Sequence, residues 1–265
     1  MKRLSLILAG LAALVVAALG DWTIGVVGNV VQVEGNAIQA GGAAWTPDQI
    51  DDLALWLDAT TGITTDGTSV TNWADRSAAG NDAEKVSTAT TWPTVGNEQL
   101  NGVDTIYFDG GDYLLTGFLS ATGTTFFAVA RMVGGETIAG ARDSENQRSF
   151  WGCPNGRTEY RAGVGTDSAI ISDFKWGTVY RVFGGKYNTA TVSLYNSGTN
   201  IYNKAQSGSG ENTTTGYMIG ALNSAGSPII PGQFHLAEIL AYRRALSEAE
   251  ILQVGRYLAE KWGIE

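Results

Sequence analysis

The chain has 265 residues, of which 44% are hydrophobic and 16% charged, with 35 Gly, 8 Trp, 10 Tyr and 8 Phe. This length suits one sizeable domain with an appendage, and the composition is that of a turn-rich, aromatic globular protein rather than a disordered one. A formal net charge of −9 argues against nucleic acid as a partner, and a single cysteine (Cys153) with a single histidine (His235) excludes an intrachain disulfide and a multi-histidine metal site.

Residues 1–20 are the first distinct segment. The start is basic, residues 6–19 are almost wholly apolar, and Ala18-Leu19-Gly20 supplies small residues at a plausible cleavage point. This order is typical of a secretory signal. As a helix, the apolar stretch from residue 4 to 19 is about 24 Å long, short of the roughly 30 Å of a bilayer core, so a membrane span is disfavoured. The alternative is an apolar arm that is retained and attaches the protein to a larger assembly.

Residues 21–44 are predicted to form a short β-rich arm and a linker. Residues 22–40 contain β-branched side chains interrupted by Gly28-Asn29 and Gly35-Asn36, which indicates short strands joined by turns. The Gly/Ala run at 40–44 is typical of a flexible joint. One domain is therefore expected to occupy residues 45–265.

From Trp45 onward, short apolar runs alternate with clusters of Gly, Asn, Asp and Ser. The runs are LALWL at 53–57, TIYF at 105–108, TFFAVA at 125–130 and TVSLY at 191–195. Many short strands with turn residues between them predict an antiparallel sandwich or barrel. TFFAVA carries apolar groups on both faces, so the strand at 125–130 is expected to be central.

The end of this domain is predicted to be helical. Ser247 and Glu250 have the spacing of a capping box, in which each side chain bonds the backbone N–H of the other residue. Ile251, Val254 and Leu258 recur at helical spacing, and Gly263 is a typical stop. A closing helix should therefore dock one apolar face on the sandwich.

Four stretches of the domain carry a family likeness: LALWLDAT at 53–60, VTNWADRSAAGNDA at 70–83, GVDTIYFDGGDYL at 102–114, and the final strand and helix at 234–263. They resemble the laminin-G-like, concanavalin-type jelly-roll superfamily, in the single-domain form of tailed-phage virion proteins and bacterial surface proteins. The resemblance implies an all-β antiparallel sandwich with a C-terminal helix packed on it. Related sandwiches serve as lectins, adhesins, sugar hydrolases and capsid decorations, so the motifs specify fold more than function.

Two loops of the resembling region are rich in oxygen ligands. Asp75, Asn81 and Asp82 share one loop, and Asp109 and Asp112 flank a Gly-Gly turn. Calcium, which takes about 6 to 8 oxygen ligands, is the one cofactor that these loops suggest. The favoured alternative is that these side chains bond nearby backbone N–H groups, as turn residues do.

Ligand-binding aromatics are expected in the segment 140–230, which carries none of the four motifs. Outer loops of a rigid scaffold hold most binding residues, and an aromatic face packs well against the C–H face of a sugar. Most aromatics of a sandwich belong to the core, so only one or two are expected to be exposed. The candidates are Trp151, Tyr160, Trp176, Tyr187, Tyr195 and Tyr202.

Catalysis is not expected. Glu238 lies in an apolar strand and can be a catalytic acid, but a structural carboxylate with bonded partners is the favoured interpretation. The Glu-x-Asp-x-Glu strand expected of a sandwich glycosidase is absent from the sequence.

The sequence thus favours a non-catalytic adhesive or structural protein at a virion or cell surface. A phage decoration, fibre or tail-associated subunit that binds a glycan or host-surface receptor is placed first. A secreted bacterial adhesin and a polysaccharide-acting enzyme are the alternatives. The N-terminal arm is expected to contact other subunits of the assembly, and the protein is expected to be oligomeric.

Overall fold

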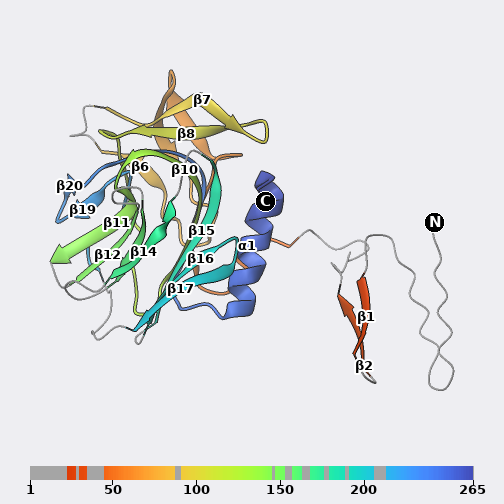
Figure 1. Cartoon of the computed structure of the whole chain (residues 1–265). Coiled ribbons are helices and arrows are strands. Elements are labelled where there is room, and N and C mark those ends of the chain that lie inside the picture. The colour runs from red at the N-terminus through yellow and green to blue at the C-terminus, as the bar shows by residue number, and fades with distance from the viewer. Residues whose placement is uncertain are drawn as a thin grey trace. The chain divides into compact units, whose positions relative to one another are not determined.

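The computed structural model describes residues 23–27, 30–34, 45–86, 91–144, 147–152, 157–162, 168–175, 179–188, 191–205 and 213–264. The chain divides into two compact units, residues 1–45 and 46–265. In the first unit, β1 (Thr23–Val27) pairs antiparallel with β2 (Val30–Glu34) (Figure 1). The signal-like segment at 1–20 and the Gly/Ala linker lie outside the described residues.

The second unit is the predicted antiparallel β-sandwich with a C-terminal helix (Figure 1). One layer is built on successive antiparallel pairs of β8 (Val103–Asp109), β21 (Gly232–Tyr242), β10 (Thr125–Gly135), β15 (Arg181–Asn188), β16 (Thr191–Asn196) and β17 (Thr199–Ala205). β3 (Leu53–Asp58) pairs with the second half of β21, and β7 (Thr94–Leu100) pairs with the outer edge of β8.

The other layer runs, strand by strand, through β5 (Ser69–Trp73), β6 (Ala83–Lys85), β9 (Leu114–Thr116), β18 (Met218–Ile219), β11 (Thr137–Ser144), β12 (Gln147–Gly152), β13 (Arg157–Ala162) and β14 (Ser168–Lys175). β4 (Ile63–Asp66) pairs with β5, and β20 (Ser227–Ile229) pairs with β19 (Leu222–Ser224), which runs parallel to β11. A short 3-10 helix, η1 (Pro47–Gln49), precedes β3.

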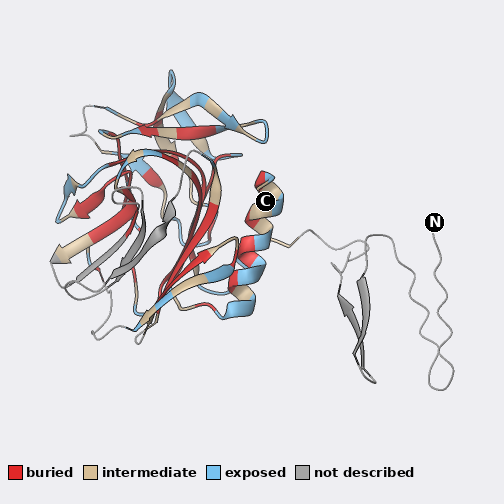
Figure 2. Ribbon diagram, viewed as in Figure 1, coloured by how far each residue is buried: buried red, intermediate tan, exposed pale blue. Residues whose placement is uncertain are grey.

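The core lies along β10 and β21. β10 is bonded on one side to β15 and on the other to β21, as its two apolar faces predicted. Phe126, Phe127 and Val129 are at most 1% exposed. Figure 2 shows buried residues along both strands and on the face of the helix that contacts the sandwich. The second half of β21 is fully buried because β3 covers the edge that β8 leaves open.

The closing helix, α1 (Glu248–Trp262), confirms the sequence prediction. Ser247 is its N-cap and forms the complete capping box with Glu250. Gly263 ends it in the left-handed region at φ 63°, a backbone conformation that glycine adopts more readily than any residue with a Cβ. The predicted apolar face, Ile251, Val254 and Leu258, is buried against the sandwich. No helix within the described residues has the length and apolar character needed to cross a membrane.

Candidate functional site

Three of the six aromatic residues predicted to bind a ligand are buried in the core. Trp151, Tyr187 and Tyr195 are at most 1% exposed, so their rings are packed inside the sandwich rather than offered to a sugar. The Tyr195 hydroxyl donates to Glu248 Oε1 at 2.8 Å. Tyr202 is half-buried on β17. The Tyr160 side chain and all of Trp176 lie outside the described residues.

The Asp75 loop has the geometry of a turn. The Asp75 carboxylate accepts four hydrogen bonds, from the backbone N–H groups of Trp56 (2.7 Å), Ser77 (2.9 Å) and Asn81 (2.8 Å) and from the Ser77 hydroxyl (2.7 Å). Asp82 Oδ1 accepts the Asp75 N–H at 2.8 Å. These bonds fix the loop against β3 and use the oxygens that a calcium ion would need. Within the described ranges, no group of three or more His, Cys, Asp or Glu side chains is placed to hold a metal ion.

Glu238 lies at the centre of a buried hydrogen-bond network. Its carboxylate accepts the indole N–H groups of Trp56 and Trp262, each at 2.6 Å, and the Lys261 ammonium at 2.7 Å. Lys261 also bonds Asp58 Oδ2 at 2.7 Å, and both carboxylates are 0% exposed. Burial raises the pKa of Glu238 above its ordinary value, and the Asp58 charge adds to this while Lys261 opposes it. Glu238 therefore links β21 to β3 and to the end of α1. Its carboxylate is fully buried and bonded, which is the structural role that the sequence favoured over that of a catalytic acid.

A cleft of about 400 Å³ opens beside the β7–β8 hairpin. We call it the Tyr107 cleft. Two half-buried aromatic rings line it among hydroxyl, amide and carboxylate groups. Its lining residues are Ser69, Thr91, Trp92, Thr94, Asn97, Tyr107, Asp109 and Asp112.

The sheet register explains why these side chains meet. Directly paired residues of antiparallel strands point to the same face. His235 of β21 pairs with Tyr107 of β8, Tyr107 pairs with Thr94 of β7, and Thr94 pairs with Ser69 of β5. A row of four cross-strand neighbours therefore supplies the wall of the cleft and its support.

Both aromatic rings of the cleft are held in place. The Tyr107 ring stacks on His235 with 4.6 Å between ring centroids, and its hydroxyl accepts the Gln233 amide N–H at 2.7 Å. Trp92 carries the Lys85 ammonium 3.9 Å above its ring. His235 occupies one face of Tyr107 and Lys85 occupies one face of Trp92, so each ring has its other face left for a sugar.

The acidic end of the cleft is a turn that presents two carboxyl groups. Asp109 Oδ1 accepts the Gly111 N–H at 2.8 Å, and Asp112 Oδ2 accepts the Asp109 N–H at 3.1 Å. This pair was predicted as a calcium candidate, and the turn alternative accounts for these two bonds. Burial raises the pKa of Asp112, and the nearby Asp109 carboxylate raises it further. In the described part of the chain, Asp112 Oδ1 and Trp92 Nε1 are buried without a hydrogen-bond partner.

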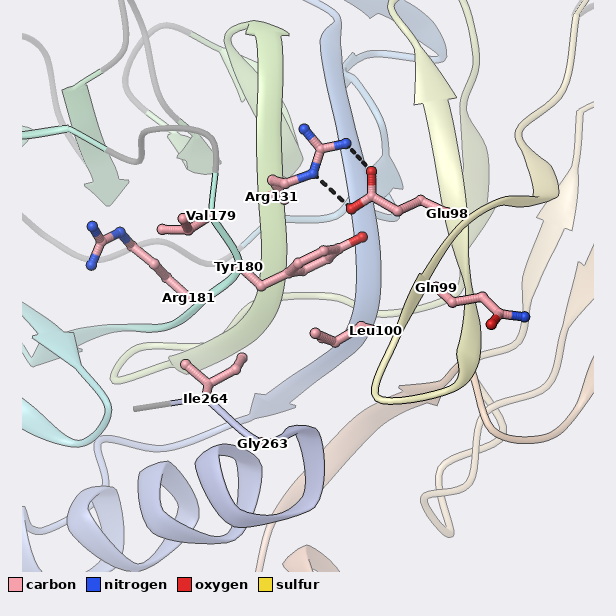
Figure 3. Close-up of a pocket in the computed structure, with 9 residues that line it drawn as sticks. All are labelled: Glu98, Gln99, Leu100, Arg131, Val179, Tyr180, Arg181, Gly263 and Ile264. Atoms are coloured by element: carbon pink, nitrogen blue, oxygen red, sulfur yellow. Dashed lines mark hydrogen bonds and ion pairs between the residues drawn. The ribbon is translucent and has the colours of Figure 1, made fainter.

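A larger cavity, of about 780 Å³, lies beyond the other end of β7. Figure 3 shows the Tyr180 ring between the Arg131–Glu98 pair and the side chains of Leu100 and Ile264. Arg131 Nε donates to Glu98 Oε1 at 2.9 Å, and a second guanidinium N–H bonds Glu98 Oε2. Burial, reinforced by Glu98, raises the pKa of Tyr180 to about 12. Arg131 and Glu98 bond each other in the wall of this cavity, and Tyr180 is the one aromatic ring among its described lining residues, whereas the Tyr107 cleft has two.

His235, the single histidine, lies between the two hollows. Its Nδ1 is 3.4 Å from the Thr105 hydroxyl and its Nε2 is 3.8 Å from Glu98 Oε2. Burial lowers the pKa of His235, Glu98 opposes this, and Arg131 adds to it.

A pH dependence follows from this lowered pKa. The unfolded chain binds a proton at His235 more readily than the folded one, so the contribution of His235 to stability is full above about pH 6.5 and declines as the pH falls below it. NMR titration of the one imidazole is expected to give a midpoint below about 6.5. His235→Phe, which keeps a ring beside Tyr107, should lose less stability than the unmodified protein between pH 7 and 5. A midpoint at or above 6.5 contradicts this assignment.

The sequence analysis missed the cleft because it sought ligand-binding aromatics only at 140–230. Tyr107, Asp109 and Asp112 lie within GVDTIYFDGGDYL, where the motif indicated fold alone. The available signal was the alternation of residue types along this strand. Ile106 and Phe108 are apolar and are buried in the core, and side chains of a strand point alternately to its two faces, so Tyr107 and Asp109 point to the other face of β8.

The fold is shared with several toxin and sialidase structures. The binding domain of Paraclostridial Mosquitocidal Protein 1 matches with a TM-score of 0.56 at 15% identity, over 78% of this chain and 52% of that one. The botulinum neurotoxin type G receptor-binding domain matches with a TM-score of 0.56 at 8% identity, over the same shares. Trypanosoma rangeli sialidase matches with a TM-score of 0.52 at 14% identity, over 80% of this chain and 33% of the enzyme.

This chain thus spans about half the length of those binding domains. No model of a protein family matches it, and no curated protein sequence matches it. At these identities the likeness establishes the β-sandwich fold, which is the architecture predicted from the sequence.

Proposed function

We propose that this protein is a non-catalytic adhesive surface protein whose sandwich binds a glycan in the Tyr107 cleft. The observation that carries the proposal is the composition of the cleft: aromatic rings of Tyr107 and Trp92 beside hydroxyl, amide and carboxylate groups. Aromatic faces pack on the C–H face of a sugar, and a few placed polar groups fix its hydroxyls. Matched structures named as binding and receptor-binding domains support a binding role for this architecture.

The proposed setting is a particle or cell surface. A phage decoration, fibre or tail-associated subunit, attached through the arm at residues 1–44 and oligomeric there, is placed first. A secreted bacterial laminin-G-like adhesin is the alternative. Intact mass of the protein from its native source separates the two, since an exported adhesin loses residues 1–20 and a virion subunit keeps them.

Hydrolysis of a polysaccharide is the second candidate function. The observation that favours it is the Asp109–Asp112 pair, in which one carboxyl has a raised pKa beside another, as acid and base pairs do. Against it, Asp112 is 3% exposed and its Oδ2 is bonded to the Asp109 backbone. The fold match to Trypanosoma rangeli sialidase, an enzyme, is a second reason to test for hydrolysis.

Binding to a glycan array is the test, with Tyr107→Leu as the variant. Leucine keeps an apolar side chain beside His235 but removes the flat ring, so affinity for a bound oligosaccharide is expected to fall about tenfold, as the loss of about 1.4 kcal/mol. Tyr202→Leu is the matched control, because Tyr202 is also half-buried but lies on β17, outside the cleft.

Equal losses in the two variants contradict the assignment of the site, provided that circular dichroism shows both to be folded. Chromatography of the same mixtures for shortened sugars decides between binding and hydrolysis. Unchanged oligosaccharides are expected, and products that disappear in Asp112→Asn would establish the enzyme instead.

A further inference from the structure

We propose that the Tyr107 cleft selects neutral glycans and rejects acidic ones, an inference that rests on the proposed function. The charged side chains among the described lining residues are Asp109 and Asp112, both acidic. Two arginines, Arg131 and Arg181, line the larger cavity beyond the other end of β7 instead. Both charged groups that line the cleft are therefore negative, and the Lys85 cation lies over the Trp92 ring rather than among the lining residues.

The two carboxylates of the cleft, those of Asp109 and Asp112, form no ion pair with a described residue. Lys85 places its ammonium over the Trp92 ring, and Arg131 is bonded to Glu98. Burial and the charge of the neighbouring Asp109 carboxylate both raise the pKa of Asp112, because each disfavours a second negative charge in the cleft.

Hydrogen-bond chemistry points the same way. An ionised carboxylate only accepts hydrogen bonds, so Asp109 needs donors from its ligand. Asp109 Oδ1 accepts the Gly111 N–H, and the Asp109 residue is exposed at the cleft, where its carboxylate can accept further hydrogen bonds from a ligand. Sugar hydroxyls supply donors without charge. The carboxylate or sulfate of an acidic sugar supplies acceptors and a like charge.

The size of the effect follows from Coulomb's law. Two like charges about 6 Å apart, at an effective dielectric constant of about 40, repel by about 1.4 kcal/mol, which is a factor of about ten in affinity. Partial screening by salt reduces this factor, so the discrimination should weaken between about 0.05 and 1 M NaCl.

The experiment uses the full chain on an array printed with matched pairs. Each neutral oligosaccharide stands beside the same oligosaccharide bearing a terminal sialic acid, a sulfate or a uronic acid. The neutral member of a bound pair is expected to bind about tenfold more tightly at low salt. In Asp109→Asn the difference should shrink to about threefold or less, because one charge is removed while an acceptor oxygen remains. Asp104→Asn is the control, since Asp104 is an exposed acid at the other end of β8 and bonds Gln99 instead.

The outcomes separate this inference from the function on which it rests. Binding of neither member of any pair contradicts glycan binding itself, and the selectivity with it. Equal or tighter binding of acidic members overturns the selectivity and leaves glycan binding standing. A neutral preference that Asp109→Asn leaves unchanged, or that Asp104→Asn removes equally, also overturns it, because the preference then arises outside the cleft.

Discussion

Replacing Lys261 by methionine is expected to destabilise the sandwich by about 3–5 kcal/mol, the usual cost of leaving a buried charge without its partner. The Lys261 ammonium bonds Asp58 and Glu238, each at 2.7 Å, and both carboxylates are 0% exposed. Methionine has a similar length but no charge, so Glu238 would lose its paired cation beside the Asp58 carboxylate, which keeps its pair with Arg76. Urea denaturation at pH 7 measures the loss.

Arg256→Met is the matched control for Lys261→Met. Arg256 is an exposed cation on the same helix, so its loss should change stability by about 0.5 kcal/mol or less. Acid offers a second check: burial raises the pKa of Glu238, so Glu238 takes up a proton more readily than an ordinary glutamate. The deficit of Lys261→Met should therefore be smaller at pH 5 than at pH 7. A loss below about 1 kcal/mol at pH 7 contradicts the assigned role of this network.

The Asp58 carboxylate shows how the same network treats its second acid. Burial acts to raise the pKa of Asp58, but the Lys261 bond and charge and the Thr60 bonds outweigh it and hold the pKa below the ordinary value. Arg76 also pairs with Asp58 and lies over the Trp56 ring at 3.9 Å. Asp58 therefore contributes stability at neutral pH that is lost as the pH falls through its lowered pKa.

Local features of the fold were predictable because their causes are local. The capping box of Ser247 and Glu250 depends on residues three apart, and the two apolar faces of residues 125–130 depend on one strand. The partners of Glu238 were not predictable, since Trp56 lies 182 residues away and sequence spacing carries no sign of that contact. The sequence nevertheless favoured a bonded structural carboxylate over a catalytic one, and Lys261 with the indoles of Trp56 and Trp262 supplies the bonded partners.

The site was harder to predict than the fold for a related reason. The cleft joins β5, β7, β8 and the loop before β7, and its wall exists only once the register places Ser69, Thr94 and Tyr107 side by side. Position in an unmatched segment was a poor guide to exposure, because Tyr187 and Tyr195 pack inward from central strands of that segment. The alternation of apolar Ile106 and Phe108 with Tyr107 and Asp109 along β8 was a stronger signal than position in the chain.

Gly255→Ala is expected to destabilise the protein by about 1–3 kcal/mol through overpacking, although alanine is the better helix former by about 1 kcal/mol. Gly255 lies in α1 where the helix crosses the turn between β16 and β17. A Cβ there would come within 2.4 Å of the Gly198 backbone nitrogen and 2.6 Å of its Cα. Both obstructing atoms belong to backbone, so no side chain can rotate away to make room.

The turn itself cannot yield, which fixes the sign of the Gly255 effect. Ser197 and Gly198 have φ of 47° and 80°, as a two-residue hairpin turn with the twist of its strands requires. The Ser197 N–H is also bonded to the Val182 carbonyl at 2.9 Å. The helix must therefore move, which separates Val254 and Leu258 from the core. Gln253→Ala, at an exposed position of α1, is the control and should shift the urea midpoint little. If Gly255→Ala raises the midpoint instead, helix propensity outweighs the contact and the close approach of α1 to this turn is wrong.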